Sequence, residues 1–116
     1  QLNDIDESDI RSACSYVLSS CWYGSLNNEA QNVLNNCSKA IILSNGDVDA
    51  YDGRGLALAL TGDMMGAISD FEYYVLHFPK DYPSEWKIQR EAWIQALQSG
   101  KNPFTPEVLE ELRNEF

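Results

Sequence analysis

The segment from Asp49 to Asp81, DAYDGRGLALALTGDMMGAISDFEYYVLHFPKD, constrains the fold of this chain more than any other part. Its apolar residues follow two helical patterns on either side of a tight turn at residues 61–63. Two antiparallel helices can approach closely only where side chains are small, and Gly55 and Ala67 meet that requirement. One hairpin of this kind cannot bury its apolar face alone, so the segment predicts a stack of similar hairpins.

Helical spacing of apolar residues continues through the rest of the chain, and no long stretch alternates in the manner of a strand. The sequence therefore predicts an all-α fold. The expected helices run from Asp6 or Ser8 toward 26, from 30 to the stop at 45–47, and then over about 48–60, 64–77, 84–98 and from 106 onward.

A chain of 116 residues is expected to form one domain. Residues 1–8 are polar and acidic and are expected to be a loose lead-in to a single domain over 9–116. The first repeat is expected over 9–45 and the second over 48–81, with a partial repeat and a C-terminal capping helix over 84–116.

The central hairpin can be overlaid on its neighbours along the chain. At an offset of 34 residues, Cys21 falls on Gly55 and Val33 falls on Ala67, and the helix after the second hairpin matches at an offset of 35. The residues expected to pack one repeat against the next are Tyr51, Gly55, Ala67, Phe71 and Pro79.

This pattern resembles the tetratricopeptide repeats, whose signature of spaced aromatic, Gly, Ala and Pro positions covers about 34 residues. The resemblance extends over residues 10–97 and departs at Leu58 and Tyr74, where an aromatic and a small residue are usual. The tail after residue 100 is similar to those that end short bacterial repeat proteins of this type. The resemblance implies a right-handed α-solenoid of about two and a half repeats.

The resemblance also implies a concave face lined by the first helix of each repeat, where such proteins bind a partner. The expected groove residues are Leu18, Trp22, Ser25, Asp49, Asp52, Leu56, Ala59, Lys87, Glu91 and Ile94. Family members that bind a C-terminal carboxylate need polar groups where this chain has Leu18, Trp22 and Gly53, so that ligand is not expected here.

Several of these residues have a second interpretation. Trp22 is either an exposed aromatic anchor for a partner, or it packs under the N-terminal segment or against the next helix. Asp49 and Asp52 either attract a basic partner group or, as we prefer, are solvated acids favoured by the helix dipole. Trp86 and Trp93, seven residues apart, are expected in the core and the cap.

The charge of the chain restricts its expected partners. The formal net charge is -10, from 18 acidic and 8 Lys and Arg residues. Such a chain repels phosphate groups, so neither nucleic acid nor a membrane surface is an expected partner, and a basic or apolar protein segment is. The acidity also has a simpler explanation, because net charge maintains solubility.

No apolar run approaches the roughly 20 residues that span a bilayer, and no signal peptide is visible. The chain begins at Gln1, which fits a processed mature chain or an excised piece. We therefore expect a soluble chain that is either cytoplasmic or exported.

Three cysteines, Cys14, Cys21 and Cys37, form no CxxC pair and have no histidine cluster nearby. Their odd number favours buried free thiols that act as small apolar fillers. The alternative is a disulfide between Cys21 and Cys37 in an exported chain.

No pattern typical of catalysis accompanies the helices. His77 is the only histidine and has no Ser or Cys partner at a familiar spacing, and phosphate-binding, dinucleotide and zinc motifs do not occur. We therefore expect no enzyme activity and no cofactor. The expected function is binding of a protein or peptide segment on the concave face. The alternative is a structural subunit, in a homo-oligomer or larger assembly, docked through its terminal helices.

Overall fold

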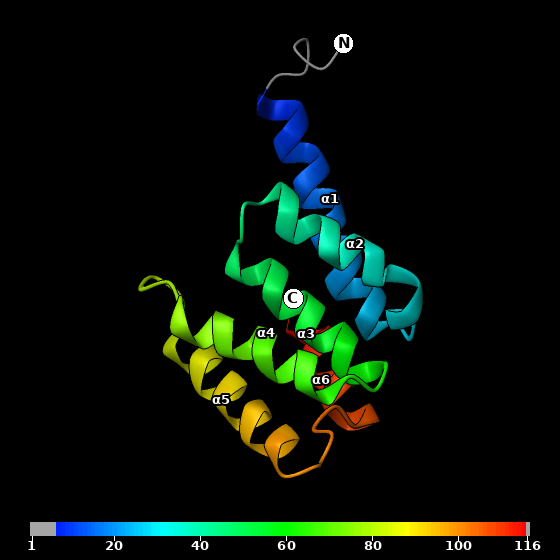
Figure 1. The fold of residues 1–116 in the computed structure, drawn as a ribbon, viewed down its shortest axis with the longest axis vertical. Coiled ribbons are helices and arrows are strands. Elements are labelled where there is room, and N and C mark those ends of the chain that lie inside the picture. Colours follow the sequence, from blue (N-terminus) through cyan, green and yellow to red (C-terminus); the bar gives the residue numbers. More distant parts are fainter. Residues whose placement is uncertain (1–6, 116) are drawn as a thin grey trace.

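The structure is a computed structural model that describes residues 7–115, with side chains from Tyr16 onward. The predicted all-α class is confirmed, since every regular element within this range is a helix (Figure 1). The helices are α1 (Glu7–Leu26), α2 (Ala30–Leu43), α3 (Val48–Leu60), α4 (Met64–Leu76), α5 (Ser84–Gln98) and α6 (Pro106–Asn114). Most of the expected lead-in lies outside the described residues, but Glu7 and Ser8 already belong to α1.

Short polar residues and glycines set the helix boundaries. The carboxylates of Asp47 and Asp63 accept hydrogen bonds from backbone N–H groups in the first turns of α3 and α4, and this satisfies donors that have no partner inside the helix. Thr105 caps α6 in the same way. Gly62 follows α3 with a φ of +98°, a conformation that glycine adopts without steric strain. Helices α3 and α5 have the bounds that the sequence predicts.

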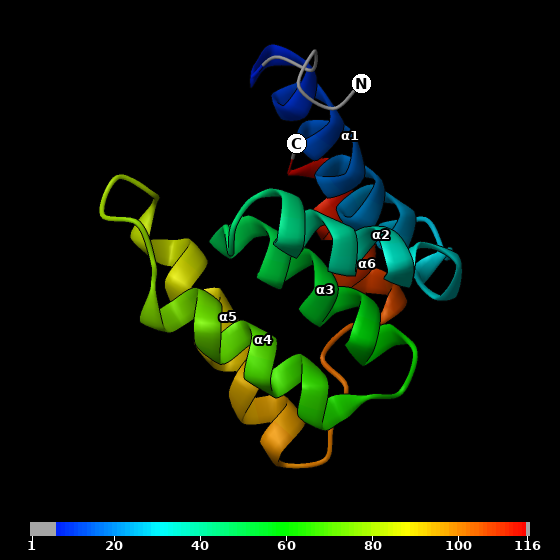
Figure 2. The same cartoon turned by 45° about the horizontal axis from the view of Figure 1, so that its top comes forward.

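Successive helices pack side by side from α1 to α5, and α1 also contacts α3 (Figures 1 and 2). Helices α3 and α4 approach closely at Gly55, where an added Cβ would lie 2.9 Å from a ring carbon of Phe71. Ala67 is fully buried beside it. Tyr51 stacks on Tyr73 at 3.7 Å between ring centres, and Pro79 is half-buried after α4.

We call one side of the molecule the inner face. It is formed mainly by residues of α1, α3 and α5, among them a single stripe of α3 at Asp49, Asp52, Leu56 and Ala59. The main core lies under the second half of this face. Its buried members are Leu26, Leu56, Ala59, Ala67, Phe71, Trp93, Leu97, Phe104, Leu109 and Leu112.

Helix α6 covers the second half of the inner face. It packs against α1 and makes no close backbone contact with α5 within the described residues. Arg113 donates a hydrogen bond to the carbonyl of Leu26, and the Asn102 amide donates to the carbonyl of Ala59 at 3.1 Å. The C-terminal helix is expected from the sequence to cap the end of the stack, and this placement is wrong. The apolar side of α6, with Leu109 and Leu112, is buried against the inner face instead.

A disulfide joins Cys21 of α1 to Cys37 of α2, and both residues are fully buried. Their Cα atoms are 4.9 Å apart, within the range that a disulfide bridges. The preferred expectation of free thiols is thus wrong for this pair, and the alternative holds; the side chain of Cys14 lies outside the described residues. A disulfide that closes a loop of this size stabilises a fold by about 3 kcal/mol.

Candidate functional site

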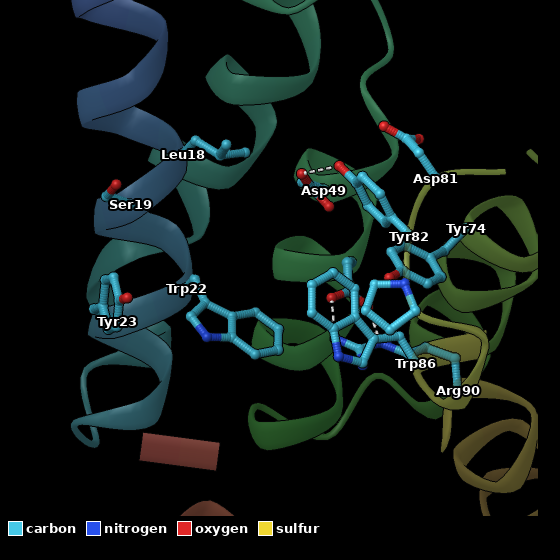
Figure 3. A pocket seen from close by; sticks show the side chains of 12 residues that line it. Leu18, Ser19, Trp22, Tyr23, Asp49, Tyr74, Asp81, Tyr82, Trp86 and Arg90 are labelled. Carbon is cyan, nitrogen blue, oxygen red and sulfur yellow. Dashed lines mark hydrogen bonds and ion pairs between the residues drawn. The ribbon is translucent and has the colours of Figure 1, made fainter. Parts of the chain in front are cut away.

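The first half of the inner face is an open pocket with a volume of about 430 Å³ (Figure 3). Helices α1 and α5 form its two walls, and the first turns of α3 form its floor. The lining residues are Leu18, Ser19, Trp22, Tyr23, Asp49, Asp52, Tyr74, Asp81, Tyr82, Pro83, Trp86 and Arg90.

Trp22 forms the centre of the α1 wall. Its indole points from α1 toward α5, with Trp86 and Tyr82 on the opposite side (Figure 3). One part of Trp22 packs against the main core and another part lines the pocket. Trp22 therefore packs beside the neighbouring helices and also lines the pocket. Its role as an anchor for a partner stays a prediction.

A buried ion pair between Asp52 of α3 and Arg90 of α5 closes the bottom of the pocket. Arg90 donates from Nε to one carboxylate oxygen at 2.9 Å and from Nη2 to the other at 2.6 Å. Both residues are only 5% exposed. Burial opposes the charge on Arg90, but Asp52 outweighs it and raises the pKa of the guanidinium above its ordinary value. Asp52 is therefore not the solvated acid that the sequence suggests.

Aromatic rings enclose the same guanidinium. Its carbon Cζ lies 4.5 Å from the ring centre of Trp93, 5.0 Å from that of Tyr74 and 5.7 Å from that of Trp22. At these distances the negative faces of the rings stabilise a cation. The ion pair thus connects α5 to α3, and the contact of the guanidinium with Trp22 connects it to α1.

Asp49 also lies on the floor of the pocket, in the first turn of α3, three residues before Asp52. Its carboxylate accepts a hydrogen bond from the Tyr82 hydroxyl at 2.8 Å. Burial raises the pKa of Asp49 above its ordinary value, and the Tyr82 hydrogen bond acts in the opposite direction. Burial likewise raises the pKa of the Tyr82 phenol. Among residues 16–115, whose side chains the structure describes, Asp49 forms no ion pair with a basic side chain.

A chain of edge-to-face aromatic contacts supports the α5 wall. Tyr74 contacts Phe78, Phe78 contacts Tyr82, and Tyr82 contacts Trp86, with ring centres 5.4, 5.8 and 5.4 Å apart. Each such pair contributes about 0.5–1.5 kcal/mol beyond the area it buries. The connection between α4 and α5 is therefore held in place by its own side chains, and the pocket wall is preformed.

The structure brings four of the predicted groove residues into the pocket: Leu18, Trp22, Asp49 and Asp52. Three others, Ser25, Leu56 and Ala59, are buried and not accessible from the surface. The expectation that they line an open groove is wrong, because the segment that contains α6 covers Leu56 and Ala59, and the Ser25 hydroxyl donates to the carbonyl of Cys21 at 2.7 Å.

The three predicted residues of α5 also lie outside the pocket lining. Lys87 and Glu91 are exposed, and Ile94 packs against the main core. Helix α5 instead presents Trp86 and Arg90 to the pocket. The expected core or cap position holds for Trp93, which is buried, and is wrong for Trp86, which lines the pocket.

Sequence reasoning missed Arg90 and Tyr82, the two residues that organise the site. A charged residue in a helix is ordinarily assigned to the solvated side. One signal was present, because Arg90 lies on the apolar stripe of α5, four residues after Trp86 and three before Trp93. A lone cation on such a stripe indicates a buried acidic partner.

Among the side chains of residues 16–115, no group of three or more His, Cys, Asp and Glu is placed to hold a metal ion. His77 follows α4 and packs against Tyr73, with 4.3 Å between ring centres. The described helices also include none with the length and apolar character needed to cross a bilayer.

Comparisons of the chain with protein-family models, with curated proteins and with solved structures found no match. The arrangement of the pocket itself is therefore the basis for a functional interpretation.

Proposed function

We propose that this chain is a non-catalytic interaction module that binds a segment of another protein in the open half of its inner face. The observation that carries the proposal is the pocket between α1, α3 and α5, with aromatic walls and an acidic floor. Pockets of a few hundred Å³ that combine aromatic lining with a few polar groups are the usual form of ligand sites.

Within this proposal, the helices form a short right-handed solenoid of the tetratricopeptide type. The recurrence at an offset of 34 residues supports this, as do the order of helix contacts and the close approach at Gly55. In a stack of this kind the first helix of each hairpin faces the ligand, and the pocket lies between three such helices.

The length of the site limits what it binds. Because α6 covers the second half of the inner face, a partner has access to a pocket of about 430 Å³ and not to a continuous groove. The ligand is then one or two anchoring side chains of a partner, not a long extended peptide. The disulfide and the ion pair between Asp52 and Arg90 hold the walls in place before binding, and this reduces the entropy lost on association.

A position-specific cross-linking experiment tests the proposal. A photoreactive benzoylphenylalanine would replace Tyr23, which is exposed at the pocket, and in a matched variant Met65, which is exposed on α4 outside the lining. In extracts of the source organism, we expect the probe at 23 to capture a partner that the probe at 65 does not. Introducing Trp86→Ala alongside the probe at 23 should abolish the capture. Capture that is insensitive to Trp86→Ala would contradict binding in the pocket.

A structural or accessory subunit is the second candidate. Large aliphatic side chains are exposed outside the pocket, with Ile42 and Leu76 each 78% and Met65 83% accessible. They lie on α2 and α4, so a docking surface would be there. It would not be on α6, whose Leu109 and Leu112 are used within the chain. Capture of a partner or of a second copy by probes at 42 and 65, but not at 23, would favour this candidate.

A further inference from the structure

We infer that the pocket accepts a cationic side chain, of lysine or arginine, from a basic segment of the partner. This inference rests on the proposed binding function and specifies the chemistry of the ligand. It stands on three features of the pocket: the balance of charges in its lining, the aromatic walls, and a cation that the chain already holds there.

The charges of the lining do not balance. Among the side chains of residues 16–115, three aspartates and one arginine line the pocket, which gives this part of the lining a formal charge of −2. Arg90 is fully engaged by Asp52 in a two-point ion pair. Among residues 16–115, whose side chains the structure describes, Asp49 and Asp81 therefore remain without a basic side chain, and Asp49 is partly buried. An entering cation would compensate the carboxylate of Asp49, whose burial is otherwise unfavourable.

The aromatic walls suit a cation as well. Trp22 extends from α1 toward α5, and Trp86 and Tyr82 lie opposite it (Figure 3). A Lys or Arg side chain that entered between these walls would place its apolar stem against the rings and its charge near Asp49. A cation within about 6 Å of an aromatic ring centre is stabilised by the ring quadrupole.

Arg90 shows that this part of the molecule stabilises a cation. Its guanidinium combines a carboxylate with three aromatic rings, at the bottom of the same pocket. The entering side chain would meet the same two kinds of group above Arg90 in the pocket. Asp49 would be the carboxylate, and the rings would be those of Trp22, Tyr82 and Trp86. The net charge of -10 also attracts basic segments over a longer range.

Other ligand classes fit less well. An anionic group would approach Asp49 and Asp81, and Arg90 has no free carboxylate-binding edge beyond the contacts with Asp52 and Gln89. A purely apolar side chain would displace water from Asp49 and supply no partner for its charge. A cationic side chain with an apolar stem satisfies both the rings and the carboxylate.

Four tripeptides, acetyl-Gly-Xaa-Gly-amide with Xaa as lysine, arginine, norleucine or glutamate, would test the inference on the full chain. Binding would be followed by NMR through the indole N–H signals of Trp22 and Trp86. We expect the lysine or the arginine peptide to shift both signals and to bind about tenfold more tightly than norleucine. The tighter of these two peptides identifies the side chain.

Matched variants separate a local contact from general attraction to an acidic protein. Asp49→Asn should weaken the cationic peptide about tenfold. Glu72→Gln removes the same charge from the exposed surface of α4 and should leave binding unchanged. The circular dichroism spectrum and the unfolding midpoint would establish that both variants are folded.

Equal binding of norleucine and of the cationic peptides would overturn the inference, and so would an equal loss in the two variants or no shift with any peptide. The proposed function is tested separately, by capture at position 23. If a partner is captured in a Trp86-dependent manner and its segment proves apolar, the binding function stands and the cation inference fails. If capture occurs only at 42 and 65, the binding function itself fails.

Discussion

The two halves of the inner face belong to the same three helices and differ in what covers them. In the second half, Leu56 and Ala59 of α3 lie beneath the segment that contains α6 and belong to the main core. In the first half, Asp49 and Asp52 of the same α3 stripe line an open pocket. The comparison shows that helices which form a continuous face need not provide a continuous binding groove.

The chemistry of each half explains the difference. The covered half is aliphatic and aromatic, so the apolar side of a short helix is sufficient to exclude water from it. The open half contains three aspartates and one arginine, and covering it with apolar residues would remove their hydration without replacing it. An occupant of the open half must therefore bring polar or charged groups of its own.

Breaking the ion pair at the bottom of the open half should have the largest effect. Asp52→Ala leaves Arg90 buried without its carboxylate, and we expect a loss of about 3–5 kcal/mol in the free energy of unfolding, measured with urea. Asp81→Ala removes an exposed carboxylate of the same pocket and should change that free energy by less than about 0.5 kcal/mol. Equal effects of the two variants would mean that the ion pair does not fix α5 to α3.

Truncation in the covered half should have the next largest effect. Leu112 is 1% exposed in α6, and Leu112→Ala should lower the free energy of unfolding by about 3 kcal/mol. Ile88→Ala removes an exposed aliphatic side chain from α5 and serves as the control, with an expected loss below about 0.5 kcal/mol. If Leu112→Ala were as mild as the control, α6 would not be a fixed cover of the inner face.

Trp86→Ala should separate binding from stability. Trp86 is half-buried in the pocket wall, so we expect a loss of only about 1 kcal/mol in the free energy of unfolding. Partner capture at position 23 should nevertheless be abolished, because the α5 wall loses the ring of Trp86. Retained capture, measured by the yield of cross-linked product, would place the partner elsewhere.

The smallest expected effect is on the titration of Asp49, measured by NMR from its carboxyl carbon. Burial should raise the pKa of Asp49 above its model-peptide value of 3.8. Tyr82→Phe should raise it further, since the Tyr82 hydrogen bond favours the ionised form. Asp47 and Asp52 also raise this pKa and Arg90 lowers it, and the substitution leaves all three in place.

The raised pKa of Asp49 also determines the direction in which this group changes the stability of the fold with pH. The folded chain holds the Asp49 proton more strongly than the unfolded chain does, so this group favours folding at low pH. Its stabilising contribution is lost as pH rises from 3.8 through the raised pKa. The unfolding midpoint of the Asp49→Asn variant, measured as a function of pH, should lack this contribution of Asp49. A lowered pKa in the wild-type chain would contradict the burial of Asp49.

Much of the fold could be predicted from local patterns. The caps at Asp47 and Asp63 and the glycine turns define the helix boundaries within the sequence itself. The surface against which α6 packs could not be predicted in this way. Its apolar spacing at Leu109 and Leu112 indicates a buried side but does not specify the surface that buries it.

The pocket was only partly predictable for a similar reason. Trp22 and Asp49 lie on the face that the repeat pattern assigns to a ligand, and both line the pocket. Arg90 and Asp52 are 38 residues apart, and each alone is typical of a solvated helix surface. Their pairing depends on the packing of α5 against α4, which brings Arg90 to Asp52 of α3 and which single-helix patterns do not contain.

The return of α6 to α1 has a consequence for how the chain unfolds. Arg113 and Leu26, which are hydrogen-bonded, are 87 residues apart in sequence. In an open row of repeats the terminal units fray independently, since each contacts only its neighbour. Here the last helix is anchored on the first, so neither end can loosen without disturbing the other. Protection against hydrogen exchange in α1 and α6 should accordingly be lost together. A further repeat could not be added after α5 without opening this closure.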